Sequence, residues 1–227
     1  RFVLKINRPG DTSIMAYDLE EQESLAEIKA WWDKWGTLIL SVVTAVCLAA
    51  AAMQGWRWYQ AKESADAGTL YAQMIQAVNA KDNGRAQAIN ERLHTDYAST
   101  AYAGMGALLA ARSAEEAGKK DEAVKSLTWI TDSDKYPELK TIAAVRLAGV
   151  YLDEGKYDEG IKLLDSLKDL KDEAALVADR KGDLLLAKGD IAAARQSWED
   201  GLKKTAATNP LVNVIQTKLS ATLQPKE

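Results

Sequence analysis

The chain has 227 residues, of which 47% are hydrophobic and 27% are charged, and its formal net charge is −4. This balance gives no basic surface of the kind that binds nucleic acid. A single cysteine, Cys47, and a single histidine, His94, exclude an intrachain disulfide and a Cys/His metal cluster. Alanine, leucine, lysine and glutamate dominate the sequence after residue 60, which predicts an all-α fold.

The first fourteen residues, RFVLKINRPGDTSI, show no clear periodicity and precede Met15. We expect Met15 to be the initiator and residues 1–14 to be an upstream, non-native segment. Residues 15–34 carry six acidic and two basic side chains and are predicted to form a short acidic cytoplasmic tail.

Residues 35–59 form the most apolar part of the chain. The 22 residues between Lys34 and Arg57 carry no charge, and as a helix they would cover about 33 Å, enough for the hydrocarbon core of a bilayer. Aromatic residues, which favour the membrane interface, gather at both ends. These expected interface anchors are Trp31, Trp32, Trp35, Trp56, Trp58 and Tyr59.

Three interpretations of this stretch compete: a retained anchor, a cleaved signal peptide and a buried core helix. The alanines at 49–52 offer a signal-peptidase site, but a signal peptide has a basic flank and this flank is acidic. We therefore predict a retained transmembrane helix. Its orientation is not set by charge, because Lys29 and Lys34 on one side balance Arg57 and Lys62 on the other.

An apolar stripe follows the span at helical spacing and consists of Leu70, Tyr71, Met74, Ile75 and Val78. We expect the anchor helix to continue directly into this segment, with Gly68 as its weak point.

The rest of the chain repeats one unit: a helix, a glycine turn and a second amphipathic helix. The turn glycines are Gly118, Gly155 and Gly189, with Gly84 as a fainter fourth, at intervals of 34, 37 and 34 residues. The pattern resembles the tetratricopeptide repeat. We expect three to four helix pairs.

Residues at fixed distances from each turn support this frame. Small residues precede the turn by seven positions and follow it by five, and a large apolar residue comes four positions later. The three sets are Ala111, Ala148 and Gly182; Ala123, Gly160 and Ala194; and Leu127, Leu164 and Trp198. The small residues would allow the two helices of a pair to cross closely.

Helix pairs of this kind stack into a solenoid with a concave groove. Residues 208–224 are predicted to cap the last pair, with Val212, Ile215 and Leu219 facing inward. A groove of mixed polar and aliphatic character suits a peptide or a partner helix. The candidate groove residues are Arg112, Glu116, Val145, Gly149, Leu152, Asp179, Asp183 and Leu186.

No nucleotide-binding, hydrolase or metalloprotease motif occurs in the sequence. His94 and Asp96 are two positions apart and do not share a helix face, so we interpret His94 as a surface residue near a helix end. We predict a protein that is not an enzyme and that needs no cofactor or metal.

The order of these features resembles the YfgM-like family, the ancillary subunit of the bacterial Sec translocon. The resemblance covers about residues 15–224 and is most specific in GWRWYQAKESADAGTLY (55–71) and in residues 95–127. It implies an inner-membrane protein with a cytoplasmic N-terminus and a periplasmic repeat domain at residues 60–227. It also implies association with translocon channel subunits and with a membrane-anchored periplasmic prolyl-isomerase-type chaperone.

Two main hypotheses follow. In the first, the protein is a membrane-anchored scaffold that helps to pass secreted chains from the channel to a chaperone. In the second, the acidic tail binds a cytoplasmic stress-response regulator, a link that the family resemblance implies. An assembly factor for an envelope complex is a third hypothesis with the same architecture.

Overall fold

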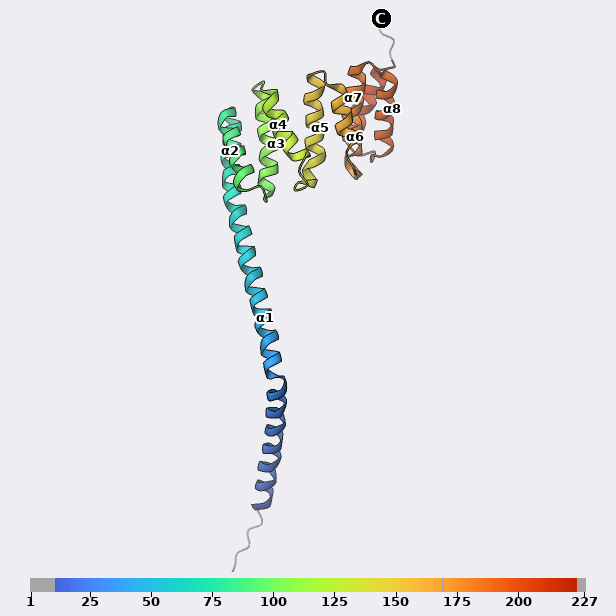
Figure 1. Cartoon of the computed structure of the whole chain (residues 1–227). Coiled ribbons are helices and arrows are strands. Elements are labelled where there is room, and N and C mark those ends of the chain that lie inside the picture. The colour runs from blue at the N-terminus through green and yellow to red at the C-terminus, as the bar shows by residue number, and fades with distance from the viewer. Residues whose placement is uncertain (1–10, 169, 224–227) are drawn as a thin grey trace, which may run out of the picture. The chain divides into compact units, whose positions relative to one another are not determined.

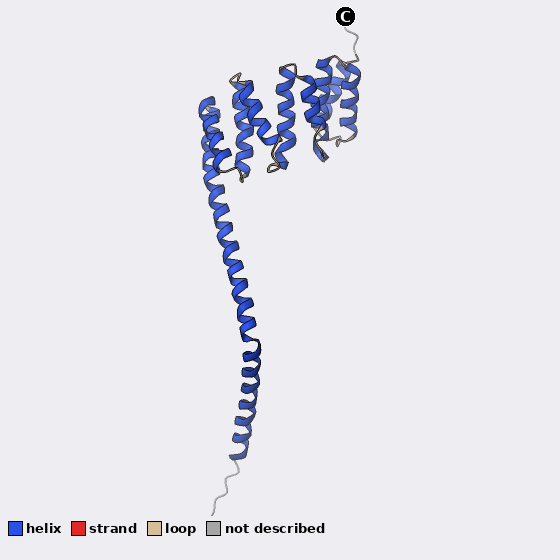
Figure 2. Cartoon of the chain, in the orientation of Figure 1, coloured by secondary structure: helices blue, strands red, loops and turns tan. Residues whose placement is uncertain are grey.

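The computed structural model describes residues 11–168 and 170–223, and all of its regular structure in these ranges is helical (Figure 2). The helices, labelled in Figure 1, are α1 (Asp11–Asn79), α2 (Asn83–Asp96), α3 (Ala101–Glu116), α4 (Lys120–Thr131), α5 (Pro137–Asp153), α6 (Tyr157–Asp165), the 3-10 helix η1 (Lys171–Glu173), α7 (Ala174–Lys188), α8 (Ile191–Lys203) and α9 (Leu211–Ala221). The all-α prediction is confirmed. The expectation for residues 1–14 falls largely outside the described residues.

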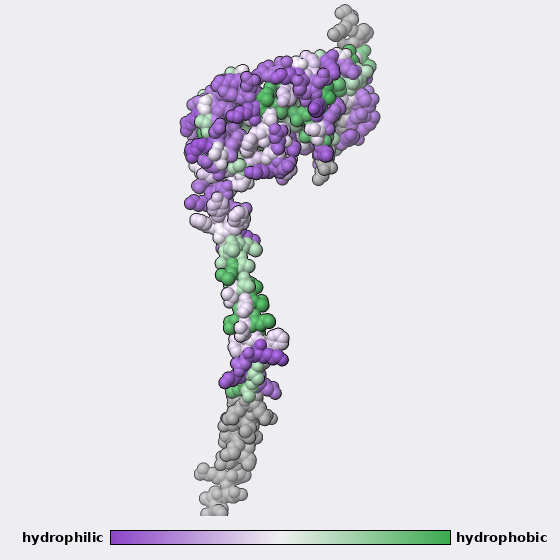
Figure 3. Space-filling model, viewed as in Figure 1, coloured by the Kyte–Doolittle hydropathy of each residue, from purple (hydrophilic) through white to green (hydrophobic). Residues whose placement is uncertain are grey.

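The chain divides into two compact units, with the boundary between Gln60 and Ala61. Helix α1 supplies the described part of the first unit. It is the one helix in the described residues that is long and apolar enough to cross a membrane. Figure 3 shows the apolar band on this helix, between more polar segments. Its side chains are exposed almost throughout, which is the opposite of a buried core helix.

Helix α1 continues without a break into the second unit, as predicted. Leu70, Met74 and Val78 are buried there in a core shared with α2 and α3. Ile75 is 40% exposed, so this position does not belong to the buried stripe. Gly68 does not interrupt the helix; the phenol ring of Tyr102 packs closely over it.

The turn glycines were predicted correctly in three units. Gly118, Gly155 and Gly189 have φ values of 72°, 72° and 95°, in the left-handed region that a residue with a Cβ adopts only at a cost. The assignment of Gly84 was wrong, because it lies inside α2 and the left-handed residue of that turn is Lys81, with φ 56°. Lys81 precedes Gly118 by 37 residues, the interval that also separates Gly118 from Gly155.

The small and large positions of the repeat are buried as predicted. Ala111, Ala148, Ala123 and Ala194 have no exposed surface, and Gly160 and Gly182 are also buried. A Cβ on Gly160 would stand 2.9 Å from Leu184, and one on Gly182 would overlap the indole of Trp198. These close approaches explain why glycine or alanine occupies each position.

Helix α9 caps the last pair. Ile215 is fully buried against Trp198, Ala175 and Ala194, with Leu219 packed beside it. Val212 is only partly buried. Arg195 of α8 holds the end of the cap by donating to the Leu219 carbonyl at 2.8 Å.

Exchanging the residue types at two turns should change stability in opposite directions. Gly155→Ala places a Cβ in a left-handed turn and should lower the free energy of unfolding by about 1–2 kcal/mol. Lys81→Gly removes the same strain and should raise it by about 0.5–1 kcal/mol after the added entropy of the unfolded chain. Urea denaturation of the full-length protein in detergent, followed by circular dichroism, measures both. Destabilisation by Lys81→Gly would contradict the strain at this turn.

Candidate interaction surfaces

The six aromatic residues predicted to anchor α1 are all exposed, by 43% to 66% of their surface. Trp31 packs beside Trp32 with ring centroids 6.5 Å apart, and Trp56 stacks on Tyr59 at 6.1 Å. The aromatic clusters thus flank the apolar band on the same helix. Their placement at membrane interfaces remains a prediction.

Arg112 and Glu116 of α3 lie together at one end of the predicted groove. Their ion pair measures 2.8 Å and both side chains are exposed. With Tyr71 and Ile75 of α1 they line a hollow of about 440 Å³ between the two helices. This hollow combines an apolar floor with a charged rim, and sequence reasoning had missed the contribution of α1.

Helix α5 contributes less to the groove than predicted. Val145 is 4% exposed and packs against Leu164 and Val177, so its assignment to the groove was wrong. The side of α5 that carries Val145 faces the neighbouring helices instead of a partner. Gly149 lies under the guanidinium of Arg180, whose Cζ would be 3.5 Å from an added Cβ, and Leu152 is half-buried.

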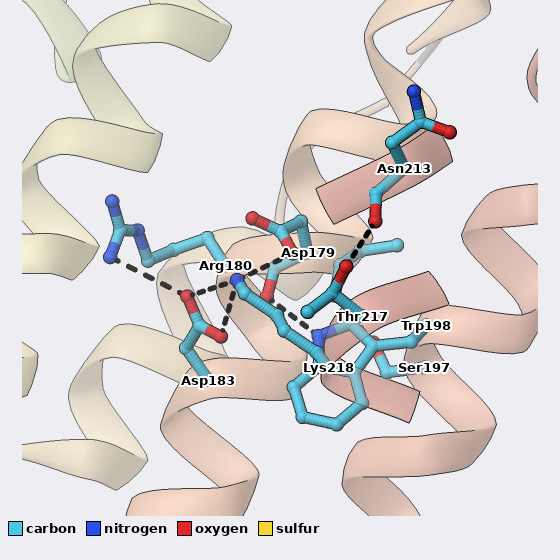
Figure 4. A network of polar contacts seen from close by, with 9 residues as sticks. Asp179, Arg180, Asp183, Ser197, Trp198, Asn213, Thr217 and Lys218 are labelled. Carbon is cyan, nitrogen blue, oxygen red and sulfur yellow. Dashed lines mark hydrogen bonds and ion pairs between the residues drawn. The ribbon is translucent and has the colours of Figure 1, made fainter. Parts of the chain in front are cut away.

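Asp179 and Asp183 of α7 are held by Lys218 of the capping helix instead of lining an open groove. The Lys218 ammonium donates to Asp179 at 2.7 Å and to Asp183 at 2.7 and 2.9 Å, and Arg180 lies 3.8 Å from Asp183 (Figure 4). Burial raises the pKa of the Asp183 carboxyl, and the bond from Lys218 partly opposes this effect. Leu186, the third predicted residue of this helix, is 39% exposed.

Removing the ammonium should destabilise this end of the domain. We expect Lys218→Met to lower the free energy of unfolding by about 1–2 kcal/mol at pH 7.5, because two carboxylates then face each other with little water. The loss should be smaller at pH 5, because the pKa of Asp183, already raised, rises further and the carboxyl takes up a proton.

Lys188→Met is the matched control, since Lys188 and Asp158 form an ion pair with both side chains largely exposed. We expect a much smaller loss for this variant than for Lys218→Met in the same urea titration, because solvent screens an exposed ion pair. Equal losses in the two variants, or a loss that does not depend on pH, would contradict the role given to Lys218.

The interpretation of His94 as a surface residue was wrong. Its ring stacks on Trp129 of α4, with centroids 3.7 Å apart and planes 9° from parallel, and its buried Nε2 has no hydrogen-bond partner among the described residues. Burial lowers the pKa of His94 to about 4, while Glu91 raises it and Lys125 lowers it further. The aromatic partner lies 35 positions along the chain, beyond the reach of a local pattern.

No group of three or more His, Cys, Asp or Glu residues in the described ranges has the arrangement of a metal site. The larger hollows in the described part of the chain lie between helices and are lined by both acidic and basic side chains. Such surfaces suit recognition of another polypeptide.

Comparison with known proteins adds a family. The sequence model of a tetratricopeptide repeat-like domain matches residues 29–224. A protein from Aggregatibacter actinomycetemcomitans is 30% identical over 213 residues, covering 91% of this chain and 99% of the relative. A protein from Haemophilus influenzae is 29% identical, covering 82% and 90%, and one from Neisseria gonorrhoeae is 28% identical, covering 91% and 99%. All three are named ancillary SecYEG translocon subunit.

Proposed function

The chain belongs to the family of ancillary SecYEG translocon subunits, and from this premise we propose that it acts as a non-enzymatic adaptor anchored beside the translocon. The observation that supports the proposal most directly is the combination of an apolar helix able to span a membrane and a domain of stacked helix pairs. The anchor would keep the domain close to the channel, which raises its effective concentration for any partner there.

We further propose the topology that the family implies. Residues 15–34 would lie in the cytoplasm, residues 35–59 would cross the inner membrane, and residues 60–227 would lie in the periplasm. The exposed groove residues Arg112, Glu116 and Leu186 would then be available to periplasmic partners.

Co-purification tests the association. The full-length protein, carrying an affinity tag after Glu227 and extracted in mild detergent, should recover the channel subunits in near-stoichiometric amounts. A control that carries an unrelated transmembrane helix in place of residues 31–60 separates recruitment by the anchor from recruitment by the domain. Absence of the channel subunits from both preparations would overturn the proposal.

A reporter tests the topology. Alkaline phosphatase, which is active only outside the cytoplasm, should be active when fused after Glu227 and inactive when fused before Tyr17. The reverse pattern would place the helix pairs in the cytoplasm and remove the periplasmic partners from the proposal.

The finer role is to help secreted chains pass from the channel to a membrane-anchored chaperone of the prolyl-isomerase type. Site-specific photocrosslinkers at Arg112 and Leu186 should capture such a chaperone in intact cells. Capture of channel subunits alone would restrict the role to the translocon.

A signalling role is the second candidate, and the acidic composition of residues 15–34 favours it. Deleting residues 15–28 should then change the envelope stress response while co-purification with the channel persists. An unchanged response would remove this candidate.

A further inference from the structure

A hollow of about 290 Å³ lies where α3, α5 and α7, the first helices of three successive pairs, come together. We call it the α3–α5–α7 hollow. Most of its lining is charged: Glu115, Lys120, Arg146, Asp153 and Arg180. Its volume is at the small end of the range for ligand pockets, so it suits one side chain of a partner and not a long segment.

The two arginines of the hollow occupy the same position of the repeat. Arg146 lies nine residues before Gly155, and Arg180 lies nine residues before Gly189. The corresponding residue of the preceding unit is Leu109. Equivalent positions on stacked helix pairs share one face of the solenoid, so the repeat brings the two guanidiniums together.

Gly149 allows the second arginine to lie flat on α5. It comes one turn after Arg146, and the Cζ of Arg180 would stand only 3.5 Å from a Cβ at this position. The guanidinium of Arg180 therefore covers the surface of α5 beside Arg146, and both side chains line one hollow.

Neither guanidinium is saturated by the described residues. The hydrogen bond of Arg146 goes to the Leu108 carbonyl at 3.5 Å, and Arg180 lies 3.8 Å from Asp183, which Lys218 already binds (Figure 4). The Nε of Arg180 is buried without a partner in this part of the chain, so a ligand would meet the terminal N–H groups. A guanidinium has five N–H donors, and most of them remain for a ligand.

The charge of the hollow fits one carboxylate. Lys120, Arg146 and Arg180 supply three positive charges, and Glu115 and Asp153 supply two negative charges. The remaining single positive charge is balanced by one carboxylate, whereas a phosphate group brings about −1.5 to −2. Burial raises the pKa of the Glu115 carboxyl, and the charges of Arg146 and Arg180 oppose this rise.

The donors of the hollow are side chains and not backbone. The N–H of Gly118 donates to the Glu115 carbonyl at 3.0 Å, and the N–H of Lys119 donates to the Ala114 carbonyl at 2.8 Å. This turn therefore does not offer the backbone nest that captures a chain terminus, whereas arginine clusters recognise acidic side chains.

We propose that the α3–α5–α7 hollow binds an aspartate or glutamate side chain of a partner polypeptide between Arg146 and Arg180. The inference goes beyond the adaptor role, because capture of an acidic side chain requires no contact with the translocon.

Ligand-observed fluorine NMR tests the proposal, since it detects the weak binding expected of a single side chain. The probes are fluorine-labelled nonapeptides of glycine and serine, capped at both ends, with a central glutamate, glutamine or phosphoserine. They are titrated with the full-length protein in lipid nanodiscs, and empty nanodiscs provide the blank. The glutamate probe should bind at least fivefold more tightly than the glutamine probe. Equal binding of these two, or binding of the phosphoserine probe more than tenfold tighter than that of glutamate, would overturn the proposal.

Variants of the hollow should change the affinity in opposite directions. Arg146→Gln and Arg180→Gln should each weaken binding of the glutamate probe at least fivefold, because each removes charged donors. Glu115→Gln should strengthen it about threefold, because a like charge beside the ligand is removed. Arg92→Gln, on the exposed side of α2, should leave it unchanged.

The variant of Glu115 keeps the test independent of folding, since a misfolded domain would not bind more tightly. Weaker binding by Glu115→Gln would show that the hollow prefers a cation and would overturn the proposal. Equal affinity in the native chain and Arg180→Gln would also overturn it.

Chemical crosslinking gives the position of the acidic side chain. A carbodiimide activates the carboxylate of the glutamate probe, and a lysine amine close to it then forms an amide. Lys120 lines the hollow and should be joined to the probe more often than Lys125, which is exposed on α4. No preference for Lys120 would place the probe elsewhere and overturn the proposal.

The two proposals fail separately. Binding of the glutamate probe by a protein that does not recover the channel subunits would overturn the adaptor role and support the hollow. Recovery of the channel without binding of the probe would overturn the hollow and support the adaptor role.

Discussion

Replacing Trp198 with alanine is expected to lower the free energy of unfolding by about 3–5 kcal/mol. The indole is fully buried and forms one core with Ala175, Ala194 and Ile215. It also packs directly on Gly182, and its Nε1 donates to the Asp179 carbonyl at 3.2 Å. The truncation therefore removes a large apolar contact, opens a cavity and removes the indole N–H that donates to the Asp179 carbonyl in addition to the helix bond of α7.

The damage should be concentrated in the last helix pair and the cap. Stacked repeats contact mainly their neighbours, so a defect in one pair opens that pair before the others. Ile215 of α9 loses its main partner, and the contact of Lys218 with α7 weakens as the cap loosens. Hydrogen exchange should become much faster in α8 and α9 and change little in α3.

Two further variants test the prediction that the loss of stability is large and local to the last helix pair. Trp198→Phe keeps most of the apolar volume and should cost less than the alanine variant. Val214→Ala, at a position that is 46% exposed on α9, should cost less than about 0.5 kcal/mol. Uniform acceleration of exchange in α3 and α9, or a loss below about 1 kcal/mol in Trp198→Ala, would contradict the local role of this residue.

The repeat could be predicted because its constraints are local. A left-handed turn selects glycine, as at Gly118, Gly155 and Gly189, and a close helix crossing selects a small residue, as at Gly182. The prediction failed at the first turn, because Lys81 adopts the left-handed conformation there and Gly84, three positions later, was taken as the turn residue.

The groove was harder to predict because it depends on what packs on each helix. Val145 and Asp179 lie ten residues before their turn glycines, and the sequence places both on the same face. In the structure α6 and α7 pack over Val145. Lys218, 39 positions after Asp179 in the chain, binds the Asp179 carboxylate. Neither contact can be predicted from the periodicity of one helix, since each depends on how successive helix pairs stack.

His94 should make the domain less stable as the pH falls. In the unfolded chain an imidazole has its ordinary pKa of about 6.5, and burial against Trp129 lowers the pKa of His94 in the fold to about 4. The unfolded state therefore binds a proton that the folded state does not, from pH 6.5 down to about pH 4. Stability is lost across this window, by about 2 kcal/mol after allowance for solvent screening, and the loss ends below pH 4.

A paired titration isolates this effect. The free energy of unfolding of the full-length protein in detergent is measured by urea denaturation from pH 7 to pH 4, for the native chain and for His94→Phe. Phenylalanine keeps the stack on Trp129 but cannot bind a proton, so the native chain should lose about 2 kcal/mol relative to the variant over this range. Thr95→Val, an exposed neighbour without a titrating group, should run parallel to the native chain. If His94→Phe also runs parallel, the imidazole takes up a proton in the fold as readily as in the unfolded chain, and its burial against Trp129 would not lower its pKa.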